Sequence, residues 1–121
     1  MHEQISVIIP TINEEEYLAD TIESLLGQYW LKEIIVADGG SQDKTVAIAE
    51  AFSQVKVIYA ERGRASQMNA GAKIAEGEIL FFVHADTLLP PGALEEIVLA
   101  CQSLRLKQAA FFFDFGRITF C

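Results

Sequence analysis

Residues 78–91 read E-I-L-F-F-V-H-A-D-T-L-L-P-P, and this stretch decides the fold that we expect. It begins with an unbroken apolar run at 79–83 and then places polar groups at His84, Asp86 and Thr87. A run that is apolar on both faces is typical of a central strand covered by helices on each side. In an open parallel sheet, ligands bind beyond the carboxyl ends of the strands. The stretch therefore predicts a buried strand that delivers an aspartate and a histidine to a ligand or a metal.

A purely structural explanation of the same residues stays open. Asp86 and Thr87 also suit the cap of the helix that follows, and residues 90–92 are typical of a loop. His84 would then be a packed or singly hydrogen-bonded histidine rather than a ligand.

The composition indicates one domain covering residues 1–121. Hydrophobic residues make up 51% of the chain, which is enough for a buried core. The sequence contains no apolar run of about eighteen residues, so we expect no membrane span. The first four residues, M-H-E-Q, lack the basic start of a signal peptide. Cys101 and Cys121 have no metal-binding spacing, so we expect a reducing, cytoplasmic location.

The formal charge of −8 argues against one class of partner. Nucleic acid is not expected, because binding to a phosphate backbone requires a basic face. An anionic ligand would have to be met by local cations, helix N-termini or a metal ion.

Four apolar segments of strand length alternate with segments of helical periodicity. The strands are expected at residues 5–9 (ended by Pro10), 33–37, 55–59 and 79–83. The helices are expected from Asn13 as N-cap to Gly27, from Ser41 or Asp43 to Phe52, over 65–75 with a stop at Gly77, and over 94–104. The third helix is expected to turn Ala65, Met68, Ala72 and Ala75 toward the sheet. Strand spacings of about 25 residues indicate βαβ units, so we predict an α/β fold with a mostly parallel sheet and helices on both faces.

Polar residues of unusual type follow each of these four strands. They are Thr11, Asn13 and Glu14, then the run 38–41, then Arg62 and Arg64, and finally His84 and Asp86. The carboxyl ends of parallel strands lie at one edge of a sheet, so all four sets belong together. Their convergence predicts a ligand site more strongly than any single motif.

The residue types suit a nucleotide diphosphate and a divalent cation. Asp38 can accept hydrogen bonds from a base or a ribose hydroxyl, and the glycines after it let the backbone come close. Arg62 and Arg64 supply cations for phosphates. Asp86, with His84, can hold Mg²⁺ or Mn²⁺, which bind through one or two carboxylates together with substrate phosphates. Such a cation stabilises a departing nucleotide diphosphate.

Each of these groups also has a structural explanation. The run Asp38-Gly39-Gly40 is an ordinary turn sequence, and the two arginines would then be solvated loop charges. Residues 14–16 suit the first turn of a helix, where the dipole favours acidic side chains. Glu14 is the best placed of these three for a ligand.

The end of the chain is apolar. Residues 109–113 predict a fifth strand, and apolar residues continue to Cys121. An exposed apolar edge would promote aggregation, so we expect a homodimer built on residues 109–121. Truncation of a longer protein is the alternative, and association of the apolar tail with a membrane also stays open.

Three segments resemble the family 2 glycosyltransferases of the GT-A fold. They are I-S-V-I-I-P-T-I-N-E-E-E-Y-L at 5–18, I-I-V-A-D-G-G-S-Q-D-K-T at 34–45, and G-R-A-S-Q-M-N-A-G-A-K-I-A-E-G-E-I-L-F-F-V-H-A-D-T at 63–87. The resemblance is greatest to the bacterial subgroup that carries H-A-D-T where other members carry D-x-D. It covers residues 5–100 in the right order.

The resemblance implies a Rossmann-like sheet of strand order 3-2-1-4 plus a C-terminal strand. It also implies a UDP- or GDP-linked sugar donor and an inverting, metal-assisted transfer to an acceptor hydroxyl. The resemblance and the residue types at the strand ends together give the expected donor-binding residues. They are Pro10, Thr11, Asn13, Glu14, Asp38, Gly39, Arg64 and Ala85. The metal-binding residues are Asp86, which matches the last aspartate of D-x-D, and His84, which replaces the first and favours Mn²⁺ somewhat.

Members of the family continue beyond the length of this chain, with the acceptor site and the general base. We therefore expect the N-terminal, donor-binding half, in which no residue is a convincing base. The alternative is a truncated, non-catalytic nucleotide-binding fragment that dimerises. A Rossmann dehydrogenase is excluded because no G-x-G-x-x-G follows the first strand. A nucleotidyltransferase is disfavoured because the same loop is acidic rather than basic and glycine-rich.

Overall fold

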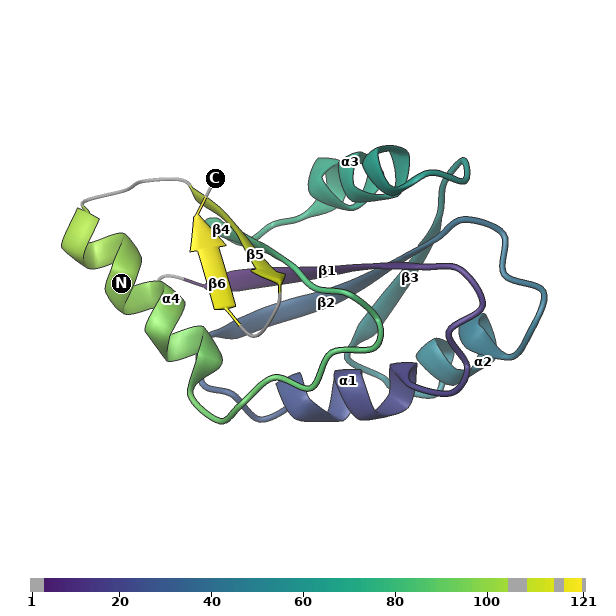
Figure 1. Cartoon of the computed structure of the whole chain (residues 1–121), viewed down its shortest axis with the longest axis horizontal. Coiled ribbons are helices and arrows are strands. Elements are labelled where there is room, and N and C mark those ends of the chain that lie inside the picture. Colours follow the sequence, from purple (N-terminus) through teal and green to yellow (C-terminus); the bar gives the residue numbers. More distant parts are fainter. Residues whose placement is uncertain (1–3, 105–108, 115–116, 121) are drawn as a thin grey trace.

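A six-stranded sheet forms the centre of the protein (Figure 1). In the computed structural model, which describes residues 4–104, 109–114 and 117–120, the strand order is β3-β2-β1-β4-β5-β6. The strands are β1 (Ile5–Thr11), β2 (Leu31–Asp38), β3 (Val55–Tyr59), β4 (Ile79–Phe82), β5 (Ala109–Asp114) and β6 (Arg117–Phe120). All neighbours pair in parallel except β6, which returns antiparallel to β5. The predicted order 3-2-1-4 with a C-terminal strand is confirmed, whereas β6 as a separate strand is not predicted.

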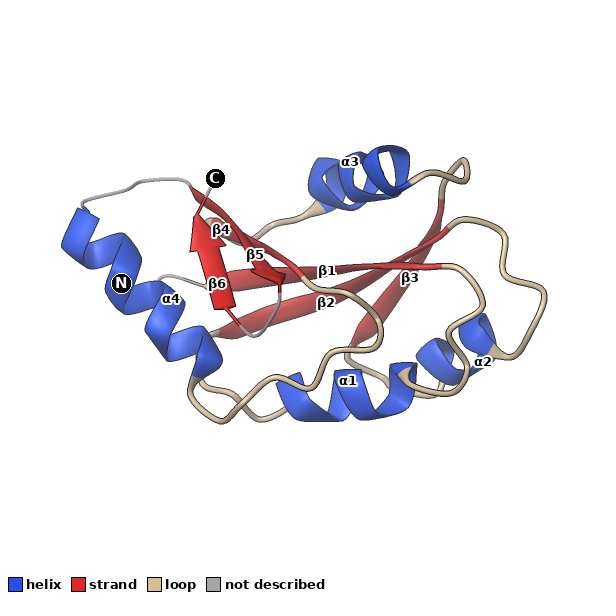
Figure 2. Ribbon diagram, in the orientation of Figure 1, coloured by secondary structure: helices blue, strands red, loops and turns tan. Residues whose placement is uncertain are grey.

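Four helices cover the two faces of the sheet (Figures 1 and 2). They are α1 (Leu18–Leu25), α2 (Thr45–Glu50), α3 (Arg64–Ile74) and α4 (Ala93–Leu104). Successive strand residues point to opposite faces, so Val7 and Phe81 join the larger core under α1, α2 and α4, while Ile8 and Phe82 meet α3. The predicted α/β fold with helices on both faces is confirmed. No helix in the described part of the chain is long and apolar enough to cross a membrane.

Helix α3 lies close to the sheet because a glycine faces it. A Cβ atom on Gly71 would lie 2.5 Å from Ile8 Cγ2, so a larger residue would push the helix away. Met68, Ala72 and Ala75 pack toward the sheet as predicted, but Ala65 is exposed. The fully buried positions of α3 are Gln67 and Gly71. The close approach brings Gln67 to the carboxyl ends of the strands.

Two features near the end of β1 differ from the prediction. Helix α1 begins at Leu18 rather than after Asn13, because Asn13 adopts a φ of 51° and its side chain accepts a hydrogen bond from Gln42 N instead of capping the helix. Strand β1 runs through Pro10 to Thr11 rather than ending at the proline. Strand β4 pairs with β1 only as far as residue 8, so the missing N–H of Pro10 leaves no partner on β4 unsatisfied.

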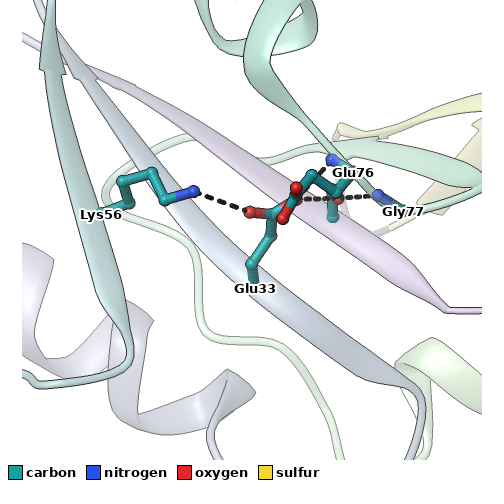
Figure 3. A network of polar contacts seen from close by, with 5 residues as sticks. Glu33, Lys56, Glu76 and Gly77 are labelled. Atoms are coloured by element: carbon teal, nitrogen blue, oxygen red, sulfur yellow. Dashed lines mark hydrogen bonds and ion pairs between the residues drawn. The ribbon is translucent and has the colours of Figure 1, made fainter.

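A polar cluster lies at the amino-terminal ends of the strands (Figure 3). Glu33 Oε2 accepts hydrogen bonds from Ser6 Oγ at 2.6 Å and from Glu76 N at 2.7 Å. Gly77 N donates to Ser6 Oγ, and Lys56 Nζ lies 3.6 Å from Glu33 Oε1. Gly77 does not end α3 as predicted, because the helix stops three residues earlier. Glycine is needed there because a Cβ atom would lie 2.8 Å from Ser6 N.

Candidate functional site

A pocket of about 280 Å³ lies at the carboxyl edge of the sheet. The loops that follow β1, β2, β3 and β4 all leave toward this edge (Figure 2). The pocket is lined by Pro10, Thr11, Ile12, Glu14, Arg62, Gly63, Arg64, Gln67 and His84. Three of the four predicted polar sets therefore meet in one place. The fourth, residues 38–41, adjoins the pocket through a hydrogen bond to Thr11.

Asp38 is 1% exposed, and protein donors occupy both oxygens of its carboxylate. It pairs with Thr11 across β1 and β2, and Thr11 Oγ1 donates to Asp38 Oδ1 at 2.8 Å. Ser41 Oγ donates to the same oxygen at 2.6 Å, while Gly40 N and Ser41 N donate to Oδ2 at 3.0 and 2.8 Å. Burial raises the pKa of Asp38, but these hydrogen bonds outweigh it and hold the pKa below its ordinary value. Asp38 thus builds the loop after β2.

Further hydrogen bonds join the loop after β1 to the loop after β2. Asn13 Oδ1 accepts from Gln42 N at 2.8 Å, and Asn13 N donates to Ser41 Oγ at 2.8 Å. Glu14 N donates to Thr45 Oγ1 at 2.7 Å. Asn13 therefore holds the two loops together, whereas Glu14 lines the pocket.

Gln67 is a buried member of the pocket lining, with 3% of its surface exposed. Its Nε2 donates to Thr11 O and to Ala37 O, both at 2.9 Å, and its Oε1 accepts from Gly63 N at 3.1 Å. Gln67 is not among the site residues predicted from the sequence. A usable signal is its position four residues before Gly71, on the face of α3 that packs against the sheet.

Two arginines give the pocket positive charge. Arg62 and Arg64 both line it, and both are exposed. Helix α3 begins at Arg64, so the positive end of the helix dipole lies at the pocket. The first turn of this described helix carries no acidic residue that would cancel the dipole. Helix N-termini and arginines both bind phosphate, so this side of the pocket favours an anion.

The segment that carries His84 and Asp86 is held by three polar side chains of α1 and the turn after it. The hydrogen bonds join Thr21 Oγ1 to Ala85 O (2.7 Å), Leu89 N to Ser24 Oγ (3.0 Å) and Leu94 N to Gln28 Oε1 (3.0 Å). Thr21 and Ser24, three residues apart, lie on one side of α1, and Gln28 extends the contact from the turn after the helix. The alternative that Asp86 and Thr87 cap the next helix is wrong, because α4 begins only at Ala93.

Negative charge gathers beside the pocket at Glu14 and Asp86. Asp86 is exposed, and among the described residues no hydrogen bond or ion pair engages its carboxylate. Burial, followed by the charges of Asp86 and Asp43, raises the pKa of Glu14. A divalent cation would relieve this repulsion, so the residues fit a metal. No group of three or more His, Cys, Asp or Glu in the described part could hold one alone, and phosphate oxygens and water would complete the shell.

The predicted site residues divide into two groups. Those that line the pocket are Pro10, Thr11, Glu14, Arg64 and His84. Those that lie outside its lining are Asn13, Asp38, Gly39, Ala85 and Asp86. Gly39 packs against Gln67, since a Cβ atom on it would lie 2.7 Å from Gln67 Oε1. Ile12, Gly63 and Gln67 also line the pocket and are not among the site residues predicted from the sequence.

The sequence matches a known family over most of its length. Residues 6–116 match the profile described as Glycosyl transferase family 2. The chain is 35% identical over 104 residues to Glycosyltransferase GlyG of Streptococcus pneumoniae, a match that covers 80% of this chain and 35% of GlyG. The chain thus spans about a third of the length of GlyG and of two further curated relatives, and less of others.

Solved structures share the fold. TarS 1–349 of Staphylococcus aureus, in complex with UDP, gives a TM-score of 0.72 at 30% identity and matches 83% of this chain with 32% of its own. The mannosyltransferase PcManGT of Pyrobaculum calidifontis, in complex with GDP-Man and Mn²⁺, gives a TM-score of 0.63 at 28% identity. This second match covers 74% of the present chain and 29% of PcManGT.

Proposed function

The chain belongs to glycosyl transferase family 2, and we propose that its pocket binds the nucleotide diphosphate of an activated sugar donor. The observation that carries the proposal is the charge distribution around the pocket of about 280 Å³. Arg62, Arg64 and the N-terminal end of α3 provide positive charge, and Glu14 and Asp86 provide carboxylates. This combination suits a diphosphate bridged by a divalent cation. UDP and GDP are both candidates, since they are parts of the ligands of TarS and PcManGT.

We assign the diphosphate to Arg62 and Arg64, and the nucleoside to the end of β1 at Pro10 and Thr11. Asp38 supports this surface by holding the loop after β2. Direct contact of its carboxylate with a base or a ribose would require one of its four protein donors to give way. The backbone of residues 39–40 lies in the same loop, and we expect it to contact the nucleoside in place of the Asp38 carboxylate.

We assign the metal to Asp86 and His84, with Mn²⁺ or Mg²⁺ as the ion. A cation bound there would neutralise charge on the departing nucleotide diphosphate. The imidazole of His84 favours Mn²⁺. Between the two side chains, Ala85 is 4% exposed and its carbonyl accepts the hydrogen bond from Thr21, which fixes the backbone that carries them.

Sugar transfer itself is proposed for the protein as a family member. The oxygen of an acceptor hydroxyl would bond to the anomeric carbon, with inversion, as the bond to the nucleotide diphosphate breaks and the hydroxyl proton passes to a base. We assign no described side chain as the base, and nucleotide binding without transfer is the alternative. Release of free nucleotide from a UDP- or GDP-sugar, assayed with candidate acceptors, separates the two.

Isothermal titration with UDP and GDP, each with and without Mn²⁺, tests the binding proposal. We expect one nucleotide to bind more tightly when Mn²⁺ is present. Arg64→Gln should weaken that binding about tenfold, because a charge-assisted hydrogen bond to phosphate is lost. Lys73→Gln is the matched control, since it removes a cation from the other end of α3. A wild-type chain that binds neither nucleotide at millimolar concentration would contradict the proposal.

Assembly and location are separate proposals. Strand β6 is an edge of the sheet, and an unpaired strand edge is a template for pairing. We propose that residues 1–121 form one domain. Two copies of this domain would form a homodimer through their C-terminal strands. Sedimentation of a monomer at micromolar concentration would refute the dimer.

A cytoplasmic location with peripheral membrane contact stays a prediction, which fractionation and vesicle co-sedimentation can check.

A further inference from the structure

Gln67 ties together three chain segments that border the pocket. Its Nε2 donates to Thr11 O at the end of β1 and to Ala37 O in β2, both at 2.9 Å. Its Oε1 accepts from Gly63 N, at the start of α3, at 3.1 Å. Both amide hydrogens and the amide oxygen are therefore engaged by backbone groups of three different segments.

We propose that Gln67 is a positioning residue for nucleotide binding, which sets the arginine loop at 62–64 against the ends of β1 and β2. The inference rests on the proposed function of the pocket. Gln67 acts through these segments, because its polar atoms are already engaged by the protein. Without the amide, Gly63 and the arginines beside it would lose their fixed distance from Thr11.

The residues around Gln67 leave room for its side chain. Thr11 O also accepts a hydrogen bond from Gly39 N at 3.1 Å, so one carbonyl joins Gln67 to the loop that Asp38 organises. A Cβ atom on Gly39 would lie 2.7 Å from Gln67 Oε1 and 2.8 Å from Ile12 Cδ1. Glycine at position 39 therefore keeps open the space that the amide occupies.

The first variant to test is Gln67→Met, which keeps the side-chain length and removes all three hydrogen bonds. The probe is whichever of UDP and GDP the wild-type chain binds with Mn²⁺. We expect the dissociation constant to rise about tenfold or more while the far-UV circular dichroism and a cooperative unfolding transition are retained. Gln54→Met is the matched control, because Gln54 is exposed in the turn before β3, at the end of that strand opposite to the pocket, and the affinity of this variant should equal that of the wild type.

The near-isosteric variant Gln67→Glu gives a second readout, in its pH profile. At pH 8 the introduced carboxylate is an acceptor that faces the carbonyls of Thr11 and Ala37, so both donors are lost. Protonation restores one donor. The ratio of the variant's dissociation constant to that of the wild type should therefore fall as the pH is lowered toward 5.5. A residue that only fills space would give a ratio that does not change with pH.

The outcomes separate this inference from the function on which it rests. A wild-type chain that binds neither nucleotide overturns the proposed function and this inference with it. A folded Gln67→Met chain with wild-type affinity overturns this inference alone. If Gln67→Met does not fold, Gly39→Ala provides the test, because it displaces the amide of an intact Gln67. Wild-type affinity in folded Gly39→Ala, with a pH-independent ratio in Gln67→Glu, would then overturn it.

Discussion

Asp38 is the last residue of β2 and Asp86 follows β4, yet the surroundings of the two carboxylates differ completely. Asp38 is 1% exposed, and its carboxylate receives hydrogen bonds from Thr11, Gly40 and Ser41. Asp86 is exposed, and within the described residues no protein donor engages its carboxylate. The first aspartate stabilises the loops around the pocket, and the second is available to a cation. An aspartate at or after the end of a strand can therefore either hold the loops of a site in place or remain available to bind a ligand.

The chain segments next to the two aspartates are held by different helices on opposite faces of the sheet. On the α3 face, Gln67 joins the ends of β1 and β2 beside Asp38. On the other face, Thr21 of α1 holds the carbonyl of Ala85 next to Asp86. Substitutions on the two helices should therefore act on different parts of the site, namely the loops around the pocket on the Asp38 side and the metal-binding segment on the Asp86 side.

The largest expected effect is on stability, from Asp38→Asn. The change removes the charge and places an amide donor among four donors, so we expect a loss of about 2–4 kcal/mol in the free energy of unfolding. Asp86→Asn should stay within about 0.5 kcal/mol of the wild type, because its carboxylate is exposed. Urea unfolding of both variants measures the contrast. Equal losses in the two would break the comparison.

A smaller effect is expected from Gly71→Ala on α3. The new methyl group would collide with Ile8, so the helix must shift and overpacking should cost about 1–3 kcal/mol. Nucleotide binding should weaken as well, because the shift carries Gln67 away from the strand ends. Asn69→Ala, at an exposed position of the same helix, is the control and should be nearly neutral. Unchanged thermal unfolding of Gly71→Ala would show that α3 is not pinned by this contact.

On the other face, Thr21→Val should act more on binding than on stability. It leaves the buried carbonyl of Ala85 without its hydrogen bond, at a cost of about 1 kcal/mol. Without this hydrogen bond the segment should position Asp86 less well. The affinity for the nucleotide in the presence of Mn²⁺ should therefore fall severalfold. Ser53→Ala, which removes an exposed hydroxyl elsewhere, should change neither quantity. Full Mn²⁺ dependence in Thr21→Val would separate Thr21 from the metal site.

The smallest effect is a gradual one, on the acid side of the pH profile. Hydrogen bonds hold the pKa of Asp38 below its ordinary value of 3.8, so the stabilisation is present above that value and is lost as the pH falls through the lower, folded-state pKa. Asp38→Asn should therefore lose less stability than the wild type between pH 5 and pH 2. Glu33 and Asp43 also have lowered pKa values and should account for the slope that remains. Identical acid slopes would contradict the ionised state of Asp38.

The sequence predicts the framework well because periodicity and strand length are local properties. Strand β3 has the predicted limits, and the strand order follows the family resemblance. The wrong helix start at Asn13 arises because its left-handed conformation depends on the loop after β2. Gln67 is missed because two of its three partners are backbone atoms of strands distant in sequence. The roles of Asp38 and Asp86 likewise depend on neighbours in space, such as Thr11, that no local pattern reveals.

Electron paramagnetic resonance of Mn²⁺, titrated with the chain in the presence of UDP or GDP, tests the role of Asp86 most directly. Free Mn²⁺ gives a signal that is lost on binding. The wild type and the control Asp20→Asn, which alters an exposed aspartate of α1, should bind the ion with nucleotide present. Asp86→Asn should bind it at least about tenfold more weakly while remaining folded. Binding by Asp86→Asn as tight as by the wild type would contradict the assignment of Asp86 as the metal ligand of the donor site.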